Sequence, residues 1–108
     1  MRPVPHPDSD DRELATLATV LRALGDPVRL ELVRRMATHG EERCLPADLR
    51  VAKSTLSHHW RVLREAGISR TRPEGRARWM SLCRDELDSR YPGLLDAVLG
   101  PLGSPAAP

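Results

Sequence analysis

Aromatic residues are scarce in this sequence, which contains two tryptophans, one tyrosine and no phenylalanine in 108 residues. A hydrophobic core must therefore consist mainly of Leu, Val and Ala, a composition that favours packed helices over a large sheet. A chain of this length is expected to form one small domain with one modest core.

Cysteines are also few, and Cys44 and Cys83 suit a reducing cytoplasm better than a disulfide framework. No apolar run reaches membrane-spanning length, and the first residues lack the charged-then-apolar order of a signal peptide. We therefore expect a cytoplasmic protein with no membrane partner.

Sequence patterns of enzyme active sites are missing as well. There is no Gly-rich phosphate loop, and no Ser-His-acid or Cys-His order occurs in a recognisable context. Ser57 and His58 are adjacent, but neighbouring residues of a helix do not face one another. The protein is therefore not expected to be an enzyme.

Charge is unevenly distributed along the chain, although the net charge is only +2. Residues 43–84 contain ten Lys and Arg against three Asp and Glu, whereas acidic residues outnumber basic ones on both sides. A basic middle between acidic flanks is typical of a protein that binds a polyanion.

Residues 53–67, inside the basic region, predict a helix with an unusual exposed face. Leu56, Trp60 and Leu63 recur at i, i+4 and i+7, which is the stripe of a helix packed on a core, and Gly67 is a good helix stop. The other positions carry hydroxyl, imidazole and long cationic side chains, with one acid near the end. This composition is typical of a helix in the major groove of DNA, and an ordinary solvated face is the alternative.

The remaining elements follow from apolar spacing and cap residues. Helices are predicted at residues 11–24, 27–38, 44–49, 53–66 and 92–99, a loop at 39–43, a polar turn or short helix at 84–88, and a β-hairpin with strands at 68–72 and 77–83. The first helix is expected to turn Leu14, Leu17, Ala18, Leu21 and Leu24 inward. The second is expected to turn Arg29, Arg34 and Arg35 outward, and Leu45 and Leu49 are expected to point inward from the third.

A short helix, a tight turn, a cationic helix and a basic hairpin form, in this order, a winged helix-turn-helix. We therefore predict a mainly α fold with a small β-hairpin. Residues 1–10 are expected to be a disordered arm, residues 11–99 a DNA-binding and dimerisation domain, and residues 100–108 a disordered tail.

Four motifs resemble the ArsR-type (ArsR/SmtB-like) family of bacterial winged helix-turn-helix transcriptional regulators. They are Leu24–Leu30, Lys53–His59, Arg61–Gly67 and the turn Glu74-Gly75-Arg76, in register over roughly residues 12–99. The resemblance implies a homodimer, joined by the first and last helices, that binds a palindromic promoter site in double-stranded DNA. It implies a repressor as the usual mode, although activation is not excluded.

The resemblance also implies which residues contact DNA: Lys53, Ser54, Thr55, Ser57, His58, His59, Arg61, Arg64, Arg72, Arg76 and Arg78. The last three would reach phosphates or the minor groove from the hairpin. For His59 the alternative is a half-buried residue that packs under the hairpin. The expected dimer interface consists of Leu14, Leu17, Leu21, Leu94, Leu95 and Val98, unless these side chains only close the core of one chain.

The sequence does not identify an effector. Many members of the family respond to a metal or an oxidant, but here Cys44 stands alone and the last helix has no His, so no recognisable set of metal ligands exists. Cys83 is more simply a small buried residue. We expect no required cofactor. The alternatives to a transition-metal effector are another small molecule, a partner protein, or no effector at all.

A second function fits the same fold: a winged helix that docks on another protein without reading DNA. Such a module needs apolar residues on the exposed face of residues 53–66, and here that face is polar and basic. The sequence therefore favours DNA binding.

Overall fold

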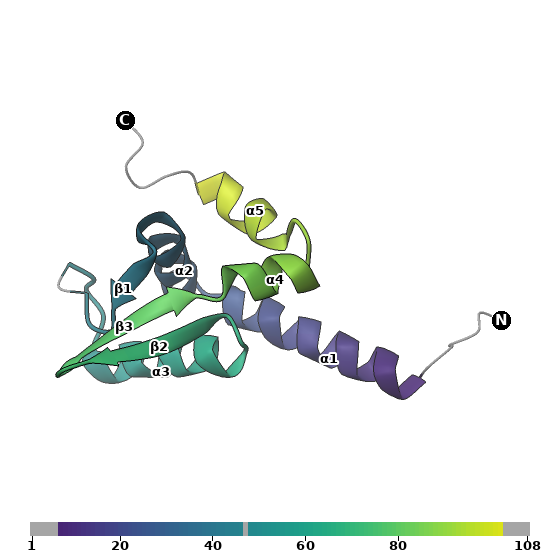
Figure 1. The fold of residues 1–108 in the computed structure, drawn as a ribbon, viewed down its shortest axis with the longest axis horizontal. Coiled ribbons are helices and arrows are strands. Elements are labelled where there is room, and N and C mark those ends of the chain that lie inside the picture. Colours follow the sequence, from purple (N-terminus) through teal and green to yellow (C-terminus); the bar gives the residue numbers. More distant parts are fainter. Residues whose placement is uncertain (1–6, 47, 103–108) are drawn as a thin grey trace.

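The computed structural model describes residues 7–46 and 48–102, in which helices surround one small sheet (Figure 1). In chain order the elements are α1 (Pro7–Leu24), α2 (Pro27–His39), β1 (Glu41–Arg43), α3 (Lys53–Glu65), β2 (Ser69–Glu74), β3 (Ala77–Leu82), α4 (Arg84–Arg90), α5 (Leu94–Leu99) and the 3-10 turn η1 (Gly100–Leu102). None of the helices in these residues is both long and apolar enough to cross a membrane.

The corner between α1 and α2 forms where the sequence predicts it. Asp26 precedes α2 in an extended conformation, and its Oδ1 accepts hydrogen bonds from the backbone N–H groups of Val28 (2.8 Å) and Arg29 (3.1 Å). Pro27 then occupies the first helical position, where no backbone N–H is needed. A capped start directly after α1 fixes the direction in which α2 leaves the corner.

The predicted stripe of α3 forms the centre of the core. Leu56, Trp60 and Leu63 are buried. They pack in one cluster with side chains from the other helices and the sheet: Val20, Ala23, Leu24, Leu32, Val33, Met36, Ile68, Met80, Leu87 and Leu95. The Trp60 indole also donates a 2.7 Å hydrogen bond from Nε1 to the carbonyl oxygen of Cys44. One face of α3 is therefore buried in the core.

The sheet has the strand order β1-β3-β2 and is antiparallel throughout. β2 and β3 form the predicted hairpin, here called the wing, in which Glu74 pairs with Ala77 across a turn where Gly75 has a φ of 59°. That left-handed conformation is cheap only for glycine. β1 adds to the other edge of β3, with Glu42 opposite Met80.

Two predictions between α2 and α3 are wrong. A loop is predicted at 39–43, but Glu41–Arg43 form β1; three charged residues show no strand pattern, and the bonds to β3 that make this strand are long-range. A helix is predicted at 44–49, but the described residues there are not helical. Cys44 gives its N–H to the carbonyl of Arg78 (3.1 Å) and its carbonyl to Trp60, so its backbone groups are used in tertiary contacts.

Leu45 and Leu49 of this segment also differ from each other. Leu45 is exposed, contrary to prediction, whereas Leu49 packs partly buried against the core. The helix that precedes α3 in the described residues is therefore α2.

Helix ends differ from prediction at both termini. α1 begins at Pro7, so residues 7–10 of the predicted arm are helical, and residues 1–6 lie outside the described part of the chain. α5 begins at Leu94 because Gly93 has a φ of 84°, which interrupts the predicted helix. The predicted tail begins with η1, and residues 103–108 again lie outside the described part. The short-helix alternative for 84–88 is confirmed by α4.

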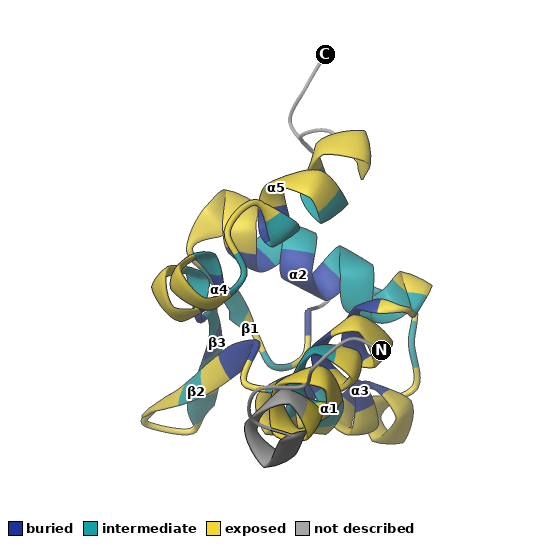
Figure 2. Cartoon of the chain, turned by 90° about the vertical axis from the view of Figure 1, so that its right-hand side faces the viewer, coloured by how far each residue is buried: buried dark blue, intermediate teal, exposed yellow. Residues whose placement is uncertain are grey.

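The inward face of α1 is another correction. The structure buries Val20, Ala23 and Leu24, whereas Leu14 is 66% exposed, Leu21 is 48% exposed and Ala18 is exposed. The reason is visible in Figures 1 and 2: most of α1 projects beyond the other elements, and only its C-terminal part is covered.

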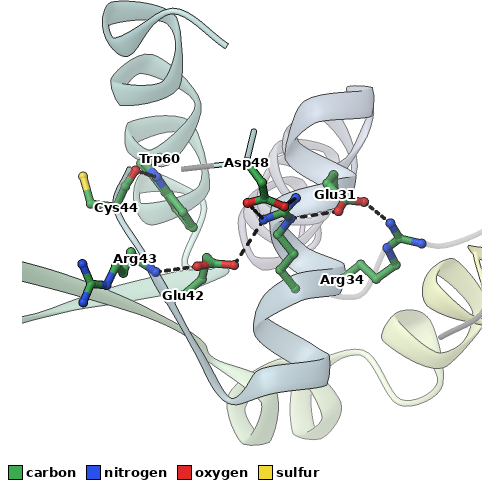
Figure 3. A network of polar contacts seen from close by, with 8 residues as sticks. Glu31, Arg34, Glu42, Arg43, Cys44, Asp48 and Trp60 are labelled. Atoms are coloured by element: carbon green, nitrogen blue, oxygen red, sulfur yellow. Dashed lines mark hydrogen bonds and ion pairs between the residues drawn. The ribbon is translucent and has the colours of Figure 1, made fainter. Parts of the chain in front are cut away.

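The arginines of α2 do not simply face solvent. Arg35 donates to both carboxylate oxygens of Asp48 (2.9 Å each) and to Glu31 (2.9 Å), and it lies 3.6 Å from Glu42. Figure 3 shows these three carboxylates converging between α2, β1 and the segment that leads to α3. Arg34 pairs with Glu31 as well. The prediction that both arginines face outward is therefore only partly right, because both side chains are half-buried among the carboxylates that pair with them.

Trp60→Phe is expected to lower the free energy of unfolding by about 1–3 kcal/mol, because the Phe ring keeps most of the packing while the Cys44 carbonyl loses its donor. Urea denaturation followed by circular dichroism measures this loss. Trp79→Phe is the matched control: Trp79 is half-buried, and within the described residues its indole makes no side-chain hydrogen bond. Equal losses in both variants would contradict the importance of the Trp60–Cys44 bond.

Candidate nucleic-acid interface

The side of α3 opposite its buried stripe carries the predicted contact residues. All of the following are exposed, and we call them the basic face of α3: Lys53, Ser54, Thr55, Ser57, His58, Arg61 and Arg64. The single acid of α3 is Glu65, in the last turn. Ala52 caps the helix without a side-chain hydrogen bond, so the first N–H groups of α3 keep their capacity to bind an anion.

His58 and Arg61 lie one turn apart and contact each other. Arg61 Nη2 is 3.3 Å from His58 Nδ1. A guanidinium only donates, so Nδ1 is the acceptor in this contact and Nε2 carries the N–H of the ring. The pair therefore presents donors from two side chains at one place on the basic face of α3.

His59 does not belong to this face. It is 7% exposed, and its Nδ1 accepts a 3.0 Å hydrogen bond from Arg29 Nη1 of α2. Arg29 in turn donates to the backbone carbonyls of Ala23 (2.6 Å) and Arg22 (3.2 Å) at the end of α1. The DNA contact predicted for His59 is therefore wrong, as is the outward direction predicted for Arg29. The alternative is right that His59 is a packed, buried residue, but its side chain bonds to Arg29 at the α1–α2 corner and not to the wing.

Burial lowers the pKa of His59; the Asp26 carboxylate, whose Oδ1 lies 3.9 Å from Nδ1, opposes this shift, and Arg29 adds to it. Burial of the same carboxylate raises its pKa, but the backbone hydrogen bonds from Arg29 and Val28, together with the nearby charged groups, more than offset this, so that its pKa is lowered. A neutral imidazole between a cation and an anion thus links α3 to the start of α2.

The wing arginines that are predicted to contact DNA fall into two groups. Arg72 is paired with Glu41 (Nη2–Oε1 2.9 Å) and with Glu74 (Nη1–Oε2 2.6 Å), and the bond from Arg72 lowers the pKa of Glu41. Arg76 and Arg78 are exposed, and none of the ion pairs in the described residues includes them. A phosphate must therefore displace carboxylates from Arg72, whereas Arg76 and Arg78 are free to bind one.

Arg43, at the end of β1, has no place among the predicted contact residues. Its guanidinium lies 5.2 Å from the ring centroid of Trp79, in a cation–π contact. Because β1 has no recognisable strand pattern, nothing in the sequence predicts that Arg43 lies beside Trp79 of β3. The sequence feature that could have identified Arg43 as a contact residue is its position at the start of the basic region, residues 43–84.

Metal ligands are not clustered in residues 7–46 and 48–102, where no group of three or more His, Cys, Asp or Glu side chains is placed to hold an ion. Cys83 is buried, and burial raises the pKa of its thiol. Cys44 is half-buried at the end of β1. The effector stays a prediction.

Comparison with known proteins decides the family. A helix-turn-helix domain family matches residues 24–72. An uncharacterized HTH-type transcriptional regulator of Bacillus subtilis, YceK, is 33% identical over 84 residues, which span 75% of this chain and 84% of YceK. A solved structure named as a possible transcriptional regulator for arsenical resistance is 32% identical, with a TM-score of 0.58 and coverage of 73% of this chain and 82% of that one. The chain belongs to the ArsR-type family of transcriptional regulators.

The transcriptional repressor BigR from Xylella fastidiosa is similar to this ArsR-type regulator over almost its whole length. It is 26% identical, with a TM-score of 0.66 and coverage of 92% of this chain and 98% of BigR. The predicted winged helix-turn-helix fold is confirmed, and so is DNA-binding transcriptional regulation as the function of the ArsR-type regulator.

Stability is expected to fall as the pH is lowered from about 7.5 to about 5.5, because burial lowers the pKa of His59 in the fold, so that the unfolded chain, with a His pKa of about 6.5, takes up the proton first. The unfolded state then binds more protons than the folded state, and this difference removes stability as the pH falls. Urea midpoints at each pH measure the decline. His59→Gln, which keeps an acceptor for Arg29 but does not titrate, should flatten it; an unchanged decline would assign the effect to other groups.

Proposed function

We propose that the protein is a homodimeric repressor that places the basic face of α3 in the major groove at each half of a palindromic promoter site. The observation that carries this proposal is the basic face of α3 itself: exposed hydroxyls and cations opposite a fully buried stripe. Large exposed apolar side chains in the described residues lie outside α3, which disfavours the alternative of a protein-docking module.

In the proposed complex, the part of the DNA that each residue contacts depends on the length and position of its side chain. Ser54, Thr55, Ser57 and His58 reach base edges and nearby phosphates, and Lys53, Arg61 and Arg64 extend the same surface along the groove. From the wing, Arg76 and Arg78 meet the phosphate backbone or minor groove, and Arg72 joins them at the cost of its pairs with Glu41 and Glu74. Each phosphate contact releases counterions, so affinity falls steeply with salt.

An exposed apolar face on α1 supports the dimer. Leu14 and Leu21 are exposed in a single chain, and Leu17 lies half-buried between them. Leu14 and Leu17 also line a hollow of about 480 Å³ together with Glu13, Arg90 and Tyr91. In a dimer with two-fold symmetry, this face of α1 is buried against the C-terminal helix of the partner chain.

The predicted share of α5 in this interface needs one correction. Leu95 is 1% exposed and completes the core of its own chain, so it is not free for a partner. Leu94 and Val98 pack only partly buried against the core, and they remain in the proposed interface.

Repression is proposed from the similarity to BigR, whose name describes a transcriptional repressor. A dimer bound over a promoter blocks polymerase without any chemical step, so DNA binding requires no cofactor. An effector, whether a metal, another small molecule or a partner protein, would act on this binding. Because the partner is DNA, we place the protein in the bacterial cytoplasm, on the nucleoid when bound.

Arg61→Ala and His58→Ala are each expected to weaken specific DNA binding by about 1–3 kcal/mol and to leave the fold intact. The measurement is fluorescence anisotropy with a duplex selected in vitro from the protein's own genomic neighbourhood, compared with random DNA. Arg70→Ala is the matched control, because Arg70 pairs with Glu86 away from the basic face of α3. Equal wild-type affinity for selected and random DNA would count against sequence recognition.

Leu21→Glu is expected to weaken dimerisation on the order of 100-fold, because an unpaired carboxylate in an apolar interface costs several kcal/mol. Analytical ultracentrifugation over a concentration series gives the dissociation constant. Leu45→Glu, which changes another exposed leucine far along the chain from α1, is the control and should leave the constant unchanged. A monomeric wild type, or a dimer that tolerates Leu21→Glu, would contradict the α1 interface.

A further inference from the structure

One ring nitrogen of His59, Nδ1, lies near a donor and an acceptor at once. Arg29 Nη1 is 3.0 Å from this atom and donates to it, while Asp26 Oδ1 is 3.9 Å from it. An imidazole nitrogen accepts a hydrogen bond only when it carries no proton, so the bond from Arg29 requires a bare Nδ1. Once Nδ1 is protonated, the ring is a cation that faces a second cation in Arg29 and an anion in Asp26. The proton therefore decides which of these two residues His59 binds.

The charged and titratable groups around this ring come from three helices. Asp26 and Arg29 belong to the start of α2, and His58 of α3 has its ring centroid 5.7 Å from that of His59. At the end of α1, Arg29 binds backbone carbonyls, and the side chain of Arg22 is exposed there. Burial, Arg29 and His58 lower the pKa of His59, and Asp26 raises it. Because His59 is 7% exposed, water screens these charges only weakly.

Protonation of His59 disturbs both residues that it faces. Arg29 also donates to the carbonyls of Ala23 (2.6 Å) and Arg22 (3.2 Å), so its guanidinium joins the last turn of α1 to α3. A cationic ring repels this guanidinium and ends its bond to α3. The same ring attracts Asp26, whose Oδ1 caps α2. The α1–α2 corner is therefore loosened on both sides.

The corner matters for DNA binding because of what α1 carries. Figure 1 shows α1 leaving the core at this corner and projecting beyond the other elements. In the proposed dimer, α1 contacts the partner chain, so a loosened corner alters the spacing between the two basic faces and leaves each face intact. A palindromic site requires both faces at one spacing, whereas a single half-site requires only one face.

We propose that the contact of His59 with Arg29 and Asp26 makes the binding of palindromic DNA pH-dependent, and that the form with a bare Nδ1 is the form that binds. The proposal rests on the proposed function and adds to it a positioning role for a histidine that does not touch DNA. Affinity is full above about pH 6.5, the ordinary pKa of His, and is lost as the pH falls through the lowered pKa of His59.

The test measures affinity by fluorescence anisotropy between pH 7.5 and pH 5.5 for two duplexes: the selected palindrome and a duplex that keeps one half-site. The reference is His59→Gln, which keeps an acceptor for Arg29 and does not titrate. Relative to this variant, the wild type is expected to lose about 10-fold in affinity for the palindrome and little for the half-site. His39 and His58 titrate in both proteins, so the comparison cancels their effects.

Asp26→Asn tests the exchange of partners directly. Asn caps a helix about as well as Asp does, but the variant lacks the charge that favours protonated His59. The pH at which affinity for the palindrome falls should therefore move to a lower value. Asp48→Asn is the matched control, because it removes a carboxylate that pairs with Arg35 instead, and it should leave this pH unchanged. Circular dichroism at each pH establishes that every variant is folded.

Several results would overturn the role of His59. Parallel profiles of the wild type and His59→Gln on the palindrome would refute it, and selective binding at pH 7.5 would then leave the proposed function intact. Equal losses on the palindrome and the half-site would contradict a change of spacing, and a simultaneous loss of the helical signal would assign the effect to unfolding. A profile unmoved by Asp26→Asn would contradict the exchange of partners. No selective DNA binding by the wild type at any pH would refute both proposals.

Discussion

The hydrogen bond from the Trp60 indole to the Cys44 carbonyl is the contact on which the arrangement around α3 depends. It closes the buried side of α3 and at the same time holds the chain after β1 in place, so that the N–H of Cys44 can bond to Arg78 on β3. A polar bond inside an apolar stripe is costly to leave unmade, which makes its geometry specific. The helix, the first strand and the wing are thus positioned by one residue pair.

The same arrangement of elements divides the arginines into a paired group and an exposed group. Arg35, Arg70 and Arg72 are paired with nearby carboxylates. The arginines of α3 and of the tip of the wing face solvent instead, and this division gives a chain of small net charge one basic side. Counting arginines in the sequence overstates that side, because it includes the paired ones.

The sequence predicts the parts of the fold that are set by local pattern. The stripe of α3, the Asp26–Pro27 start of α2 and the Gly75 turn of the wing each follow from spacing or from one conformational preference, and each is confirmed. What it misses is set by distant partners: β1 exists only because β3 offers an edge, and the segment after it gives its backbone bonds to the wing and to Trp60 instead of forming a helix. Within the candidate interface the same distinction holds. His59 has the sequence context of a DNA contact, and only the fold reveals that Arg29 binds it.

Arg29 has a further consequence because it binds three parts of the chain at once. Its guanidinium donates to the last turn of α1 and to His59 of α3, while the α2 start that carries it is capped by Asp26. In the proposed dimer the exposed face of α1 meets a partner, so the angle between α1 and α3 determines how far apart the two basic faces lie. The polar contacts of Arg29 at that corner therefore add to the packing of Val20, Ala23 and Leu24 against the core in fixing the angle between α1 and α3, and with it the spacing of the two DNA half-sites in the proposed dimer.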